Sequence, residues 1–148
     1  MRRLRGSLIR LGGTFETFVP ALHARLLLND CVARRASAAE AKRLVADDLR
    51  ALARNRHQGS QAVVLRTRAR LACLSGERDA ALEGLRASDH LFEAADVPEE
   101  AARDRYAHGV LQGGDEGLRL QAAALETLRS FGYVNPRKDV AAYYPELF

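Results

Sequence analysis

The sequence predicts an all-α protein, and three observations lead to that prediction. The 148 residues include 26 Ala, 22 Leu and 21 Arg, which favour helices, and only one Ile and four Thr, which favour strands. Apolar residues recur at helical spacing in six segments. Capping residues, glycines and prolines separate these segments by short connectors. An all-β fold is therefore excluded, and a parallel sheet, which needs several Val- and Ile-rich runs, is not expected.

The length suits one domain with a single core, which we place at residues 15–148. We expect residues 1–14 to form a basic N-terminal arm, because they carry four arginines and no acidic residue. A first amphipathic helix and a targeting segment are the alternatives, although the apolar run of a signal peptide is missing. No apolar run approaches the roughly 18 residues that a membrane span needs, so no membrane partner is expected.

Two helices are expected at the beginning of the domain. The first runs from about Pro20 to Arg35, because proline suits the first turn of a helix. The second begins after Ser37, whose hydroxyl would accept a hydrogen bond from the backbone amide of Glu40. The Glu40 carboxylate would in turn reach back to the backbone amide of Ser37, as in a capping box. It ends near Asn55.

Two further helices follow in the middle of the chain. The third runs from about Ser60 to Leu74 and ends at Gly76. The fourth opens at Asp79, a residue that often caps a helix N-terminus.

The last two helices and the C-terminal segment complete the prediction. Pro98 marks the first position of the fifth helix, which Asp96 or Val97 would cap. Asp115 caps the sixth helix, which a glycine and a proline end. The segment 133–148 is aromatic, and we expect it to form a short last helix that caps the open end of the core.

Short connectors make successive helices antiparallel neighbours, so the six helices form about three helical hairpins. The hairpins repeat about every 40 residues, which is typical of an α-solenoid in which stacked pairs bury one another's apolar faces.

The stretch 65–88 places small residues where two paired helices would cross or turn. These are Ala69, Gly76, Ala81 and Ser88. The stretch resembles one tetratricopeptide repeat, and the regions 106–125 and 37–41 resemble a second copy and part of a third. The motif prefers Leu where this chain has Arg68.

The ending Leu-Arg-Ser-Phe-Gly-Tyr-Val-Asn-Pro, residues 128–136, is similar to the tails of helical-repeat regions at the C-terminus of large bacterial serine/threonine kinases and related signalling proteins. This second resemblance implies a repeat module that regulates a catalytic domain not contained in this chain.

A candidate partner-binding site follows from the repeat register. The resemblance implies that the first helix of each repeat lines an inner groove, which here would present Val63, Arg66, Arg70 and Cys73. Arg66 and Arg70 are four residues apart and share a helix face. Basic residues in this groove hold acidic peptides or a C-terminal carboxylate in related proteins, and guanidinium groups suit carboxylates. The alternative is that Arg66, Arg68 and Arg70 simply form a solvated surface. Arg68 is expected to point away from the other two, as a snorkelling or ion-paired residue.

Charge is distributed unevenly along the chain. Residues 1–70 carry 15 basic and 5 acidic side chains, whereas residues 71–148 carry 8 basic and 14 acidic ones. The halves could attract each other between molecules and cause head-to-tail self-association. The basic half could instead contact an acidic partner or nucleic acid, or the asymmetry could be accidental surface variation.

Signals of catalysis or of a cofactor are missing. The chain has no phosphate-binding glycine loop and no kinase motif, and its four histidines are scattered. Cys31 and Cys73 belong to no cluster, so we expect reduced, buried thiols in a cytoplasmic protein. No metal, no cofactor and no enzymatic activity are expected.

The sequence therefore predicts a non-catalytic protein-interaction or scaffold module that presents a basic groove to an acidic peptide or partner domain. The alternatives are the regulatory repeat region of a kinase-type signalling protein and a nucleic-acid contact through the basic N-terminal half. Aromatic residues make up only 6% of the chain, and the basic half has only Phe15 and Phe18, which disfavours single-strand binding.

Overall fold

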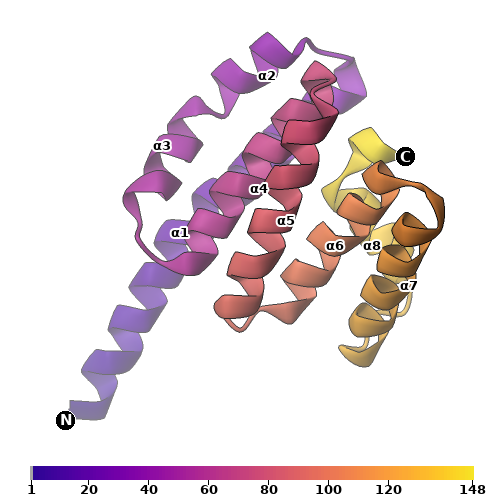
Figure 1. Cartoon of the computed structure of the whole chain (residues 1–148). Helices are drawn as coiled ribbons and strands as arrows, with labels where there is room; N and C mark the ends of the chain where they lie inside the picture. The colour runs from indigo at the N-terminus through magenta and orange to yellow at the C-terminus, as the bar shows by residue number, and fades with distance from the viewer. Residues whose placement is uncertain (1) are drawn as a thin grey trace.

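The all-α prediction is confirmed by a computed structural model, which describes the backbone of residues 2–148 and the side chains of residues 17–148. Over residues 2–148 the chain forms helices and no strand (Figure 1). The elements are α1 (Arg2–Arg34), α2 (Ala38–Leu44), α3 (Ala46–Arg54), α4 (Gln58–Ser75), α5 (Arg78–Ala94), α6 (Pro98–Gln112), α7 (Gly114–Ser130), α8 (Pro136–Tyr143) and the 3-10 helix η1 (Pro145–Leu147).

The first helix begins earlier than the sequence predicts. Helix α1 starts at Arg2 and contains Pro20 in its interior, so the expected start at Pro20 is wrong. A proline removes one backbone hydrogen bond from a helix, but its fixed φ angle is still helical. The expected basic arm, residues 1–14, overlaps the beginning of α1; Met1 and the side chains of residues 1–16 lie outside the described part of the chain.

The second predicted helix is divided in two at Val45. The Ser37 hydroxyl accepts the Glu40 amide at 3.2 Å, as expected, whereas the Glu40 carboxylate pairs with Arg34 at 3.3 Å. Val45 has a non-helical backbone (φ −89°, ψ 2°) and a fully buried side chain. The break lets both short helices contact α1 and α4, and a buried cluster that includes Leu28 and Cys31 forms between them.

Helices α4 to α7 are successive antiparallel neighbours (Figure 1). Gly76 ends α4 in the left-handed conformation (φ 74°), and Val97 with Pro98 begins α6, as predicted. The predicted caps Asp79 and Asp115 instead lie inside the first turns of α5 and α7, where a carboxylate still favours the positive end of the helix dipole.

A close contact fixes α6 against α7. A Cβ atom added to Gly109 would lie 2.6 Å from the carbonyl oxygen of Gly117, so the two backbones meet where no side chain separates them. Glycine allows this approach because it has no side chain.

The C-terminal segment packs against the body of the molecule. Helix α8 contacts α6 and α7, and η1 contacts α1, α4 and α6. Tyr144 and Val140 are buried in the largest core cluster, with side chains from α4 to α7. We call the side of α4 that faces α6, α8 and η1 its inner side, and the opposite side, which carries Arg68, its outer side. None of the helices in the described part of the chain combines the length and apolar character needed to cross a membrane.

Candidate functional site

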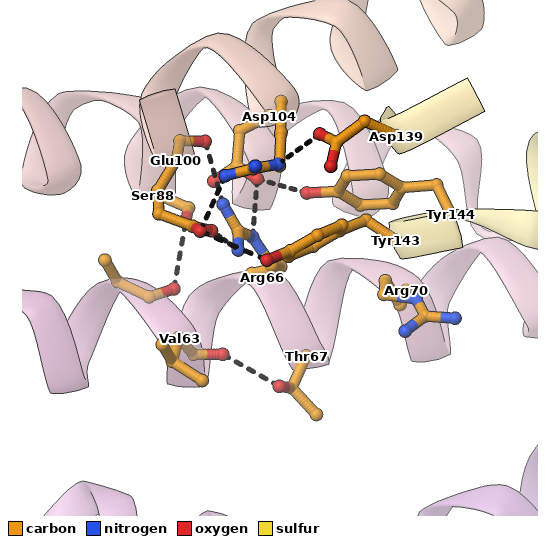
Figure 2. A network of polar contacts seen from close by, with 12 residues as sticks. Val63, Arg66, Thr67, Arg70, Ser88, Glu100, Asp104, Asp139, Tyr143 and Tyr144 are labelled. Atoms are coloured by element: carbon orange, nitrogen blue, oxygen red, sulfur yellow. Dashed lines mark hydrogen bonds and ion pairs between the residues drawn. The ribbon is translucent and has the colours of Figure 1, made fainter. Parts of the chain in front are cut away.

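Arg66 and Arg70 both project from the inner side of α4, one turn apart (Figure 2). Both residues are buried, with 8% and 3% of their surface exposed. The expectation of an open basic groove at these two arginines is therefore wrong. Their guanidinium groups are covered by carboxylates of the same chain, which α6 and the C-terminal segment supply.

Arg66 is held by two acidic residues of α6. Its Nε donates to Oδ1 of Asp104 at 2.6 Å, its Nη1 pairs with the Glu100 carboxylate, and its Nη2 donates to the Glu100 carbonyl oxygen at 2.8 Å. The guanidinium also stacks over the ring of Phe92, 4.4 Å from its centre. All three nitrogens are thus engaged, which fixes the side chain in one orientation.

Asp104 is the most deeply buried acid of this cluster. Its Oδ1 accepts hydrogen bonds from Arg66 and from the Tyr144 hydroxyl, while its Oδ2 has no hydrogen-bond partner among the described residues. Burial raises the pKa of Asp104, and the nearby Arg66 guanidinium opposes that shift. Burial likewise raises the pKa of Tyr144, which stays a neutral donor.

Glu100 connects this cluster to α8. Its carboxylate accepts hydrogen bonds from Arg103 at 2.7 Å and from the Tyr143 hydroxyl at 3.3 Å, besides the pair with Arg66. Burial alone would raise the pKa of Glu100, but the guanidinium groups of Arg66 and Arg103 outweigh burial and lower it. Arg103 also pairs with Asp139 at 2.7 Å. The cluster therefore ties α4, α6 and α8 together.

Arg70 binds the end of the chain. Its Nε and Nη2 donate to the two carboxylate oxygens of Glu146 at 2.6 and 2.8 Å. Nη2 also donates to the Asn29 side-chain oxygen at 2.9 Å, and Asn29 donates to the carbonyl oxygen of Ala142 at 2.9 Å. Side-chain exposure is only 3% for Arg70 and 4% for Glu146. The carboxylate that Arg70 binds thus comes from the protein's own C-terminal segment.

The other two predicted site residues, Cys73 and Val63, lie in different surroundings. Cys73 is half-buried near the Arg70–Glu146 pair, and burial, helped by the Glu146 charge, raises the pKa of its thiol to about 11. The thiol is therefore protonated at neutral pH and is a poor nucleophile. Val63 instead lines a cleft, together with Arg66.

This cleft, which we call the α1–α4 cleft, has a volume of about 230 Å³. Its lining residues are Phe18, Ala21, Leu22, Arg25, Val63, Arg66, Phe92, Glu100 and Tyr143. The Arg25 guanidinium lies 4.3 Å from the centre of the Tyr143 ring. Among the side chains of residues 17–148, no carboxylate forms an ion pair with Arg25. Arg25 is thus a cation at the cleft that lacks an acidic partner there.

Sequence reasoning did not identify Arg25. It also missed the three acidic residues whose carboxylates pair with the α4 arginines, which are Glu100, Asp104 and Glu146. Glu100 and Asp104 are four residues apart on α6, a spacing that places two acids on one helix face. The charge difference between the two halves of the chain is the signal that could have indicated that acids of the second half bind arginines of the first.

The carboxylates of this cluster are engaged by side chains of the same chain. Arginines and tyrosines hold the Glu100, Asp104 and Glu146 carboxylates. In the described part of the chain, no three His, Cys, Asp or Glu side chains gather where they could hold a metal ion. Comparisons with protein-family models, with curated proteins and with solved structures returned no match.

Proposed function

We propose that this protein is a non-catalytic interaction module that binds a short acidic segment of a partner protein in the α1–α4 cleft. The observation that carries the proposal is Arg25, a cation at the cleft with no acidic partner among residues 17–148. The expected groove residues Val63 and Arg66 line the same cleft. Arg70 supports the module from within, because Glu146 of the C-terminal segment covers it, and Cys73 is half-buried near this pair.

The walls of the cleft define the chemistry of the bound segment. Phe18, Leu22 and Phe92 offer apolar surface, and the exposed fraction of Phe18 is 57%. The charges of Arg66 and Glu100 are already paired with each other. A partner segment would therefore place an apolar side chain in the cleft and a neighbouring carboxylate on Arg25, where a charge-assisted hydrogen bond contributes about 1.5–3 kcal/mol.

The hairpins α4/α5 and α6/α7, preceded by α2 and α3, support a short solenoid of tetratricopeptide-like pairs as the scaffold of this module. A cytoplasmic location and a role as the regulatory repeat region of a kinase-type signalling protein are parts of the same proposal. The location rests on the two unclustered cysteines, and the regulatory role rests on the resemblance of residues 128–136.

A peptide titration tests the proposed function. The probes are the blocked pentapeptide Gly-Leu-Glu-Phe-Gly and its Gln analogue, measured by calorimetry against wild type, Arg25→Glu and Arg129→Glu. Arg129 is exposed on α7, away from the cleft, and provides the matched charge reversal. We expect the acidic peptide to bind wild type and Arg129→Glu alike, and at least tenfold more weakly to Arg25→Glu. Equal binding of the acidic and Gln peptides would overturn the proposal.

The exposed cations of α2 to α4 keep a nucleic-acid contact as the second candidate. They are Lys42, Arg43, Arg50, Arg54 and Arg68. Their helices carry no aromatic side chain on which bases could stack. If a single-stranded oligonucleotide binds, and this binding falls steeply with salt and is lost on reversal of these charges, the second candidate replaces the first.

A further inference from the structure

A second groove lies on the outer side of α4, away from the α1–α4 cleft. Helices α2 and α3 contact α4, and α5 contacts it as well; the groove of about 550 Å³ is lined by residues of all four helices. We call it the outer groove. Its apolar lining includes Leu49 of α3, Leu65 and Ala72 of α4, and Ala80 of α5.

The groove is long enough to seat a short helix. Gly84 of α5 lies so close to Ala69 of α4 that an added Cβ atom would stand 2.9 Å from the Ala69 Cβ. Both residues line the groove, so at this point of the floor the helices α4 and α5 meet with no side chain larger than that of alanine between them. The α4 stretch from Leu65 to Ser75 is about 15 Å long, which corresponds to about three turns of a docked helix.

Positive charge surrounds the apolar floor. Lys42, Arg50 and Arg68 line the groove, and Glu77 is the acidic residue among the lining side chains. Lys42 and Arg68 are exposed and form no ion pair with any side chain of residues 17–148. Arg50 pairs only with Asp47, and both of these side chains are mostly exposed. The cations of this groove are therefore available to a partner.

The geometry points to a docking site for an acidic amphipathic helix of another protein. The apolar stripe of such a helix would lie on the floor, and its Asp and Glu side chains would face Lys42, Arg50 and Arg68, as in helix-in-groove recognition. The chain's own C-terminal segment, which carries Glu146, is not the occupant, because it packs on the inner side of α4. An apolar floor without aromatic side chains favours a helix over a nucleic acid.

The test is a selection from a display library of single amphipathic helices with randomised polar positions. Wild-type protein is the bait, and the enriched peptides are then titrated against three variants. Lys42→Glu/Arg68→Glu reverses the charge of the groove, and Ala80→Trp fills it without a change of charge. Arg86→Glu/Arg129→Glu reverses two exposed arginines of α5 and α7 outside the groove. Circular dichroism confirms that all variants are helical.

We expect enriched helices with a net negative charge, which bind at least tenfold more weakly to the charge-reversed and the filled variants and equally well to the control. The result that overturns the inference is enrichment without an acidic bias, no enrichment at all, or equal binding to the filled variant. Because Arg25 lies outside this groove, Arg25→Glu should leave the selected helices bound, which separates this inference from the proposed function.

Discussion

On the inner side of α4, Arg66 and Arg70 are 8% and 3% exposed, and each is bound to carboxylates that come from more than 30 residues further along the chain. Arg68 stands between them in the sequence, is exposed, and pairs with no carboxylate among residues 17–148. Arginine thus has two roles on one helix, depending on its position. The reason is that each residue step turns the side-chain direction by about 100° around the helix axis. The inner arginines hold the fold together, and the outer one is available to a partner.

The difference has an energetic consequence. A buried ion pair adds little net stability, yet loss of one partner leaves an uncompensated buried charge and costs about 3–5 kcal/mol. An exposed pair contributes about 0–1 kcal/mol. Substitutions on the two sides of α4 should therefore differ by several-fold in their effect on the free energy of unfolding.

The largest effect is expected at Asp104, which has 0% exposure and binds both Arg66 and Tyr144. Asp104→Ala should lower the free energy of unfolding by about 3–5 kcal/mol, measured by urea denaturation. Asp104→Asn, which retains an acceptor but not the charge, should lose less. A loss below about 1 kcal/mol for Asp104→Ala would show that the inner cluster is not essential to the fold.

The next effect concerns the C-terminal segment. Glu146→Gln removes the charge that Arg70 binds at 2.6 and 2.8 Å, so we expect a loss of about 1.5–3 kcal/mol and faster hydrogen exchange in α8. Glu116→Gln is the matched control, because Glu116 forms an exposed pair with Arg119 on α7. If the amides of α8 exchange at the same rate in both variants, Arg70 does not hold the C-terminal segment.

A smaller effect should appear as a pH dependence at Glu100. Arg66 and Arg103 lower its folded pKa below the ordinary value of 4.5 despite burial. The unfolded chain then binds the proton more tightly, so the stabilisation by Glu100 is complete above about pH 4.5 and is lost as the pH falls through the folded pKa. The stability difference between wild type and Glu100→Gln should narrow between pH 6 and pH 3; a constant difference would contradict the assigned charge contacts.

The smallest effect is expected at the exposed pair of Arg50 with Asp47, whose side chains are 68% and 86% exposed. Arg50→Ala should change the free energy of unfolding by less than about 0.5 kcal/mol in the same urea assay. A loss as large as that of Glu146→Gln would mean that the outer side is also part of the folded scaffold.

Local sequence signals predicted the ends of the helices well, but they predicted poorly the features that depend on packing between helices. Ser37, Gly76 and Pro98 marked helix ends correctly, because caps and turns depend on residues close in sequence. The break at Val45 was missed, since it depends on burial against α1 and α4. The continuation of α1 through Pro20 was also missed, because local rules assign proline to the first turn of a helix.

The candidate site was predicted in part. The spacing of Arg66 and Arg70 placed both on one side of α4, but Glu146 lies 76 residues from Arg70 and no local pattern connects them. The segment 133–148 was expected to cap the core, and the structure shows that its Glu146 covers Arg70, one of the two arginines that were expected to bind a partner. The difference in charge between the two halves of the chain is thus partly an internal complementarity.

The most direct test compares Arg68→Ala with Arg70→Ala in parallel urea unfolding experiments. The two substitutions delete the same side chain two residues apart on one helix, so helix propensity affects both equally. Arg70→Ala should lose about 3 kcal/mol, because Glu146 stays buried without its cation, whereas Arg68→Ala should change stability by less than about 0.5 kcal/mol. Equal losses would contradict the division of α4 into a structural inner side and an available outer side.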